Sequence, residues 1–405
     1  MTGKRLSSKE MLEKLVGFDT TSHRSNLDLI HFVRDYLDGF GIASELIFDT
    51  GKEKASLYAT IGPANKAGGP ANKAGGPADK AGVMLSGHTD VVPVADQAWD
   101  SDPFTLREHD GLLYGRGTCD MKGFIAVALS KVPDLVASQL TEPVHFALSY
   151  DEEVGCLGAH GIADHIKNAP FSKPRLCVVG EPTGMKAITG HKGICDYDCQ
   201  VHGLECHSSL APYGVNAVEY AAELVAFIKS MARRTAKEGP FNKSFDPPFT
   251  TIHTGIMQGG TAVNIVPHKC NFTFEIRTIP GHDPDKIVEE ISEFAWKKLE
   301  PMMKEVDPKT GIRLVRSVQV PAFDISNDDP AVTSVLSWSG ANGAEKVSFG
   351  TEAGIFQQAG VPTVVCGPGH IAQAHKPNEF VAIEQLTKCE NFLDRMIRQL
   401  RKAAA

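Results

Sequence analysis

Residues 83–90 read VMLSGHTD, a short apolar run followed at once by a histidine and an aspartate. The apolar part predicts a buried β-strand, with His88 and Asp90 just beyond it, where open α/β sheets bind their ligands. The two side chains are two residues apart on an extended segment, so they should lie on the same face. His88 can therefore bind a metal while Asp90 holds its second ring nitrogen, although such a pair alone is more often structural.

Two further predicted strands, at residues 144–149 and 176–180, also end in acidic residues. The first precedes the acidic triplet 151–153, and the second precedes Glu181. Carboxylates packed this closely repel one another unless they share a cation or a proton. An acidic surface patch is the alternative, but a run that directly follows an apolar strand indicates a site.

Two glycine-containing segments supply the remaining candidates. The stretch GRGTCDMKG, residues 115–123, places Asp120 in a turn before a predicted helix at 123–138. There Asp120 can hold an ion or simply cap the helix. Near the end of the chain, His370 follows a Gly-Pro-Gly run and His375 lies in AHKPNE. Either histidine could reach a metal.

Composition limits the class of protein. With 405 residues the chain exceeds the usual size of one hydrophobic core, so two domains are expected. Hydrophobic residues make up 42% and charged residues 22% of the chain, as in ordinary globular proteins. The net charge of −8 and the lack of basic runs argue against nucleic-acid binding. A polar N-terminus, no long apolar stretch and nine cysteines without a CxxC pair predict a cytoplasmic protein with reduced thiols.

The first part of the chain has an α/β pattern. Helices are predicted at residues 9–18 and 27–40, followed by strands at 43–48 and 56–61. Residues 62–82 contain three copies of a seven-residue unit, GPANKAG, GPANKAG and GPADKAG. This segment is rich in Gly, Pro and Ala and has nothing to bury, so we expect an exposed hairpin extension that activity does not need.

From residue 186 the pattern changes to an α+β arrangement. Strands are predicted at 194–201, 250–256 and 271–277, and helices at 216–234 and 283–299. The α/β pattern resumes after residue 321, with strands at 347–349 and 363–365 and a closing helix from 383. The sequence therefore predicts a discontinuous first domain, residues 1–185 and 321–405, interrupted by a second domain, residues 186–320.

Five short motifs, GHTDVV, GRGTCDMKG, DEE, GEPT and AHKPNE, occur in this order along almost the whole chain. Together they resemble the zinc-dependent aminoacylase and carboxypeptidase family. The resemblance implies a zinc-peptidase-like catalytic domain with a central mixed sheet. It also implies that the insert is a ferredoxin-like lid and dimerisation domain, and hence a homodimer.

The resemblance implies a site for two divalent ions, with zinc expected and cobalt or manganese also compatible with mixed nitrogen and carboxylate ligands. His88 and Glu181 would bind one ion, and Asp120 would bridge to the other. Glu153 and His375 would bind that second ion, since the AHKPNE context favours His375 over His370. Asp90 would orient His88, and Glu152 would be the general base.

The same resemblance implies contacts from the second domain. His207 would stabilise the oxyanion, across the subunit boundary in a dimer, and Asn264 would add a polar contact. Arg277 would bind a substrate carboxylate, for which a guanidinium is suited by its bidentate geometry. Gly350 and Thr351 belong to a loop that would face the substrate. Ordinary surface polarity is the alternative for each.

The implied activity is hydrolysis of the amide bond of an N-acyl amino acid. Within the family, the sequence most resembles the members that act on N-acetylornithine. We therefore predict this substrate, which would be cleaved to ornithine and acetate in arginine biosynthesis. N-succinyl-diaminopimelate or another N-acyl amino acid is the alternative substrate. A catalytically inactive protein that only binds small molecules is the alternative outside the enzyme class. Glutamate instead of aspartate at Glu181 is typical of the deacylases and carboxypeptidases more than of the aminopeptidases.

Overall fold

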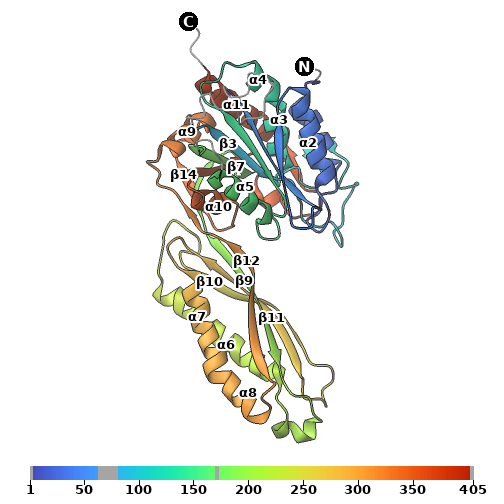
Figure 1. The fold of residues 1–405 in the computed structure, drawn as a ribbon, viewed down its shortest axis with the longest axis vertical. Helices are drawn as coiled ribbons and strands as arrows, with labels where there is room; N and C mark the ends of the chain where they lie inside the picture. Colours follow the sequence, from blue (N-terminus) through green and yellow to red (C-terminus); the bar gives the residue numbers. More distant parts are fainter. Residues whose placement is uncertain (1–2, 63–80, 169–172, 402–405) are drawn as a thin grey trace. The chain divides into compact units, whose positions relative to one another are not determined.

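The computed structural model of the chain describes residues 3–62, 81–168 and 173–401. These residues form two compact units, drawn in Figure 1. The first unit contains Met1–Gly190, Asp324–Glu345 and Thr351–Ala405, and the second contains His191–Phe323 and Lys346–Gly350. Both boundaries of the long insert lie a few residues later than the sequence pattern indicated.

A nine-stranded mixed sheet forms the centre of the first unit, with the order β1-β2-β6-β3-β7-β15-β8 followed by two short strands beside β8. The inner strands β6, β3, β7 and β15 run parallel to one another, whereas β1, β2 and β8 are antiparallel to their neighbours. The strand bounds are β1 (Ser44–Phe48), β2 (Ala55–Ile61), β3 (Val83–His88), β6 (Val144–Ser149), β7 (Leu176–Pro182), β8 (Ala187–His191), β13 (Phe323–Asp324), β14 (Ala344–Val347) and β15 (Thr363–Gly367). A separate three-stranded sheet contains β4 (Arg107–His109), β5 (Leu112–Tyr114) and β16 (Phe380–Ala382).

Helices cover both faces of the central sheet (Figure 1). Neighbouring residues of β3 mark the two faces, because Gly87 lies against Ile125 of α3 whereas Ser86 faces Glu352 at the start of α10. Helices α1 and α11 pack on α3, and α5 packs on α10. The helix bounds are α1 (Ser8–Val16), α2 (Leu27–Gly39), α3 (Lys122–Ser130), α4 (Val132–Ala137), α5 (Leu157–Asn168), α9 (Pro330–Ser339), α10 (Ala353–Gln358) and α11 (Ile383–Leu400).

The helix prediction for residues 123–138 is wrong. The single helix expected at residues 123–138 is two helices, α3 and α4, because Pro133 lacks an N–H and its ring would clash with the preceding turn. The exposed hairpin extension expected at residues 62–82 stays a prediction, although β6 separates the flanking strands β2 and β3 in the sheet. Most of that segment, residues 63–80, lies outside the described residues.

The second unit is an antiparallel four-stranded sheet, in the order β10-β11-β9-β12, packed on helices. Its βαββαβ sequence and this strand order are those of a ferredoxin-like fold. Its elements are β9 (Gly193–His202), η2 (Ser208–Tyr213), α6 (Ala217–Glu238), β10 (Thr251–Gly259), β11 (Lys269–Thr278), α7 (Pro284–Phe294), η3 (Ala295–Leu299), α8 (Glu300–Val306) and β12 (Gly311–Val320). Asp283 caps α7, with Pro284 at its first position, as the sequence indicated.

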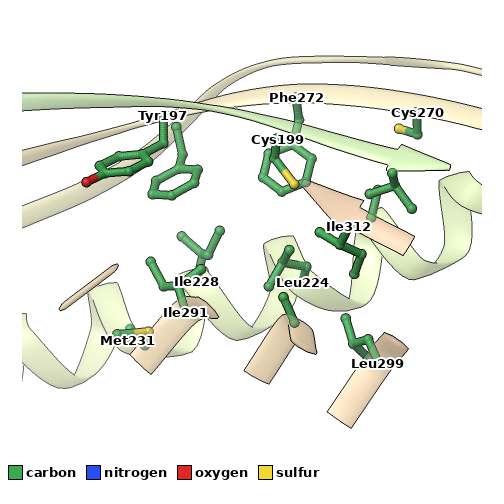
Figure 2. Packing of buried hydrophobic residues seen from close by; sticks show 14 of the residues in the cluster. Tyr197, Cys199, Leu224, Ile228, Met231, Cys270, Phe272, Ile291, Leu299 and Ile312 are labelled. Atoms are coloured by element: carbon green, nitrogen blue, oxygen red, sulfur yellow. The ribbon is translucent and has the colours of Figure 1, made fainter. Parts of the chain in front are cut away.

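Alternating buried residues of β9 and β11 form the sheet side of the core in this unit. Figure 2 shows Tyr197, Cys199 and Phe272 of the sheet facing Leu224 and Ile228 of α6. Removing such apolar surface from water is the main favourable term that holds a helix on a sheet. The unit therefore has a hydrophobic core of its own, as a separate domain requires.

No helix in the described ranges is both long and apolar enough to span a membrane. All nine cysteines are described, and each is a free thiol.

Candidate metal centre

The parallel strands of the first unit bring the predicted acidic residues to one edge of the sheet. β3 ends at His88, which is in register with Ser149 at the end of β6, directly before the acidic triplet 151–153. β7, on the other side of β3, carries Glu181. Because the carboxyl ends of neighbouring parallel strands meet at the same edge, side chains far apart in the sequence converge there.

His88, Asp120 and Glu181 form one group of candidate ligands, with one atom from each within 4.8 Å of the others. His88 Nε2 lies 2.9 Å from Asp120 Oδ1 and 3.7 Å from Glu181 Oε1. All three side chains are buried. One imidazole nitrogen and two carboxylates, withdrawn from water, are a donor set that suits a divalent ion.

Asp120, Glu153 and His375 form a second group, which meets the same distance limit. His375 Nε2 lies 3.3 Å from Asp120 Oδ2 and 3.0 Å from Glu153 Oε2. Asp120 thus turns one oxygen toward His88 and the other toward His375. A carboxylate shared in this way joins the two groups into one centre.

The buried carboxylates of the centre favour the binding of a cation. Burial and the neighbouring Asp120 together raise the pKa of Glu153 to about 7, although the hydrogen bond with His375 opposes this shift. Burial alone would also raise the pKa of Asp120, but hydrogen bonds with His375 and His88 outweigh it and lower that pKa. Glu153 Oε1 and Glu181 Oε1 are buried and have no hydrogen-bond partner in the described part of the chain. Buried oxygens in this state fit metal ligands, because unpaired buried acceptors are otherwise costly.

Glu152 lies beside both groups but belongs to neither. Its Oε2 is 4.0 Å from His88 Nε2, and Cys156 Sγ donates a hydrogen bond of 3.4 Å to its Oε1. Burial raises the pKa of Glu152 well above the ordinary value, and although His88 opposes this shift, Glu153 adds to it. A carboxylate whose pKa is raised in this way is suited to accept a proton near neutral pH.

Asp90 contacts more than the histidine for which the sequence predicted it. His88 Nδ1 lies 3.0 Å from the Asp90 carbonyl oxygen and 3.5 Å from its carboxylate Oδ1. The same carboxylate accepts the backbone N–H of Glu152 at 3.0 Å and that of Glu153 at 3.3 Å. Asp90 therefore contacts a candidate ligand and also holds the backbone of the acidic triplet.

Asp151 had no predicted role, and the structure provides one. Its carboxylate pairs with Lys54 Nζ at 2.6 Å, and the same ammonium group donates to the carbonyl of Ser22. The hydroxyl of Ser22 in turn donates to Asp90 Oδ2 at 2.8 Å. Asp151 thus ends a chain of contacts that supports Asp90.

Sequence reasoning gave no role to several buried charged residues around the centre, among them Arg116, Glu352 and Glu379. Arg116 and Glu379 form an ion pair of 2.8 Å, each side chain only 1% exposed. Both lie inside motifs quoted above, so their positions carried a signal that was not used. Glu352 is fully buried and accepts from Ser86, and burial raises its pKa to about 7 despite the nearby hydroxyl of Ser149.

The other predicted site residues are each described within their own unit. His207 and Asn264 are exposed in the second unit, where Ser208 N–H donates to the Asn264 carbonyl and brings the two segments together. Arg277, in the same unit, pairs with Glu275 at 2.8 Å. Gly350 also belongs to the second unit, whereas Thr351 is buried in the first and its hydroxyl accepts from Ala353 N–H.

His370 makes a local contact instead of a metal contact. At the start of the short helix η4 (Ile371–Gln373) its backbone N–H donates to Gln373 Oε1 at 3.1 Å, and its carbonyl accepts from Cys119 Sγ at 3.4 Å. Among the described residues it is absent from both candidate ligand groups.

The fold and this centre define a metal-dependent hydrolase, and the comparisons with known proteins agree. Residues 84–399 match the profile of peptidase family M20/M25/M40, so the chain belongs to this family. An acetylornithine deacetylase of Myxococcus xanthus is 36% identical over 391 residues, which cover 95% of each chain. An acetylornithine deacetylase of Pasteurella multocida is 32% identical, over 93% of this chain and 92% of the relative.

Solved structures support the fold. An M20 family metallo-carboxypeptidase from Sulfolobus solfataricus has a TM-score of 0.72 and 17% identity, over 96% of this chain and 98% of its own. The aminopeptidase PepT from Bacillus cereus has a TM-score of 0.70 and 18% identity, over 98% of this chain and 100% of its own. At such low identities the likeness concerns the fold alone.

Proposed function

We propose that the protein removes the acetyl group from N-acetylornithine, using two divalent ions held by the two ligand groups. The observation that carries this proposal is the arrangement of Asp120, whose two oxygens face histidines of different groups. His88 and Glu181 would complete the first site, and Glu153 and His375 the second. Two ions in such a site polarise a carbonyl and lower the pKa of a water molecule.

In this proposal Glu152 moves the proton. As a carboxylate it would accept a proton from the attacking water, and once protonated it would return that proton to the departing amino nitrogen. Its raised pKa and its position beside His88 support the double role. Asp90 would hold the acidic triplet and His88 in place during this proton transfer.

The substrate is supported by the relatives named above and by Glu181, which is typical of the deacylases in the family. We expect the zinc-loaded protein to cleave N-acetylornithine with kcat/KM about tenfold or more above that for N-succinyl-diaminopimelate or N-acetylmethionine. Release of the free amine measures all three reactions. Preference for another acyl amino acid would keep the site and change the substrate, while no turnover with two ions bound would contradict the proposal.

His207 is proposed to stabilise the oxyanion. Its Nδ1 accepts the backbone N–H of Ser209, so a neutral ring carries its proton on Nε2, where it can be donated. We expect His207→Ala to lower kcat by about 10²–10³-fold, as the loss of one oxyanion donor does. Metal content, measured by elemental analysis, should not change.

The control for His207→Ala is His253→Ala, an exposed histidine on β10 of the same unit. It should leave both kcat and metal content at the values of the unchanged protein. Equal rates for the two variants would remove His207 from the mechanism.

Several finer features belong to the same proposal. Zinc is the proposed ion, with cobalt or manganese also suited to these ligands. Arg277, Asn264, Gly350 and Thr351 would contact the substrate, and His207 would act across a homodimer. Nine free thiols are compatible with a cytoplasmic location, where the reaction would supply ornithine for arginine synthesis.

A further inference from the structure

Glu379 links the segment that carries His375 to the segment that carries Asp120. Its Oε1 accepts the backbone N–H of Cys119 at 2.8 Å and that of Asp120 at 3.0 Å. Its Oε2 accepts the N–H of Gly117 at 2.9 Å and Arg116 Nη1 at 2.8 Å. One buried carboxylate thus receives four hydrogen bonds, all from the turn that presents the shared carboxylate of Asp120.

Arg116 extends this network to His375. Its Nη1 lies 3.4 Å from the Lys376 carbonyl, and its Nη2 donates to Gln97 Oε1. Gln97 Nε2 then donates to the carbonyl of His375 at 3.2 Å. Arg116, Glu379 and Gln97, which we call the clamp, therefore hold the backbone on both sides of the second ligand group.

His375 needs such support more than the other histidine does. Its side chain is 51% exposed, whereas that of His88 is fully buried and fixed by packing. Its backbone has a φ of 60°, a left-handed conformation that a residue with a Cβ adopts only when its surroundings impose it. The position of this imidazole therefore depends on contacts to its backbone.

We propose that Glu379 is a positioning residue which, through the clamp, fixes Asp120 and His375 relative to each other and sets the affinity of the second ion site. This inference rests on the proposed function, which supplies the two ions. Glu379 itself belongs to neither candidate ligand group among the described residues. The clamp contacts the backbone of Asp120 and of His375, and His375 belongs to the second group alone of the two. The first site should therefore depend on Glu379 much less than the second.

The test is a calorimetric titration of the metal-free protein with Zn²⁺. Glu379→Gln keeps the size of the side chain but replaces one accepting oxygen with an NH₂ group, which would face backbone N–H donors. We expect one of the two binding steps to weaken by about 10–100-fold, as the loss of an outer-sphere partner does. His375→Ala, which removes a ligand of the second group only, identifies which step belongs to that group.

Glu384→Gln is the matched control, because this carboxylate lies on the surface of α11 and pairs with Lys388, one helical turn away. It should bind both ions as the unchanged protein does. Excess Zn²⁺ should restore turnover to Glu379→Gln, since a weakened site can be filled by mass action. A purely structural defect would not respond to the ion.

Equal weakening of both steps in Glu379→Gln, or no weakening, would overturn the inference. If circular dichroism shows that this variant does not fold, Gln97→Ala replaces it, because Gln97 lies nearer the surface and should weaken the same step. Failure of the unchanged protein to bind two ions would instead contradict the proposed function. The two failures are therefore distinguishable before any variant is compared.

Discussion

Glu152→Gln is expected to lower kcat for N-acetylornithine by about 10²–10⁴-fold, the usual contribution of a general base and acid. The amide keeps the size of the side chain but cannot accept a proton from water. Only the proton transfer should be lost, because Glu152 lies outside both ligand groups. Steady-state kinetics with the zinc-loaded variant measure the loss.

Metal content decides how this result is interpreted. Two ions per chain in Glu152→Gln, as in the unchanged protein, would place the defect in proton transfer. The exposed Glu384→Gln variant controls for the substitution itself and should retain full activity. A rate for Glu152→Gln near that of the control would rule out the general-base assignment, whatever the metal content.

The strand-end argument predicted the centre because parallel strands impose it. An apolar run followed by a polar residue is visible in sequence, and His88 and Glu181 both appear in that pattern. Parallel pairing then brings the ends together without further information. Asp120 and His375 lie in loops, so their inclusion depended on the resemblance of whole motifs.

The supporting contacts could not be predicted in the same way. Glu379 contacts backbone N–H groups about 260 residues earlier in the chain, and nothing in local sequence specifies which backbone a buried carboxylate will meet. Asp151 likewise resembled its acidic neighbours, yet it pairs with Lys54 away from the ligands. Spacing and composition identify residue types, while the partners of a buried charge follow from tertiary packing.

The edge strand β12 is not predicted by the sequence, and the reason is a different one. Its residues, Gly311–Val320, include two arginines and are mostly not buried, so the apolar pattern that marks a strand is weak. The ladder with β9 forms nevertheless, because a neighbouring edge of free N–H and C=O groups is available. The formation of this strand therefore depends on the free edge of the folded sheet, and not on an apolar pattern in its own residues.

Asp120→Asn is expected to have the largest effect on metal binding, since Asp120 is the one residue in the described ranges that belongs to both ligand groups. An amide has only one accepting oxygen, so the nitrogen would face either His88 or His375 and leave that side without a ligand. The metal content should fall from two ions to one or none. We expect kcat to fall by at least about 10³-fold, the equivalent of ~4 kcal/mol, because one polarising ion contributes several kcal/mol.

Elemental analysis after dialysis and steady-state kinetics together test this expectation. Asp35→Asn, on the exposed surface of α2, is the matched control and should keep both ions and full activity. The two positions should differ in the number of ion sites that they affect. Glu379→Gln should weaken one site, whereas Asp120→Asn should affect both. Two tightly bound ions in Asp120→Asn would contradict the shared carboxylate, and with it the argument that one residue joins the two groups into a single centre.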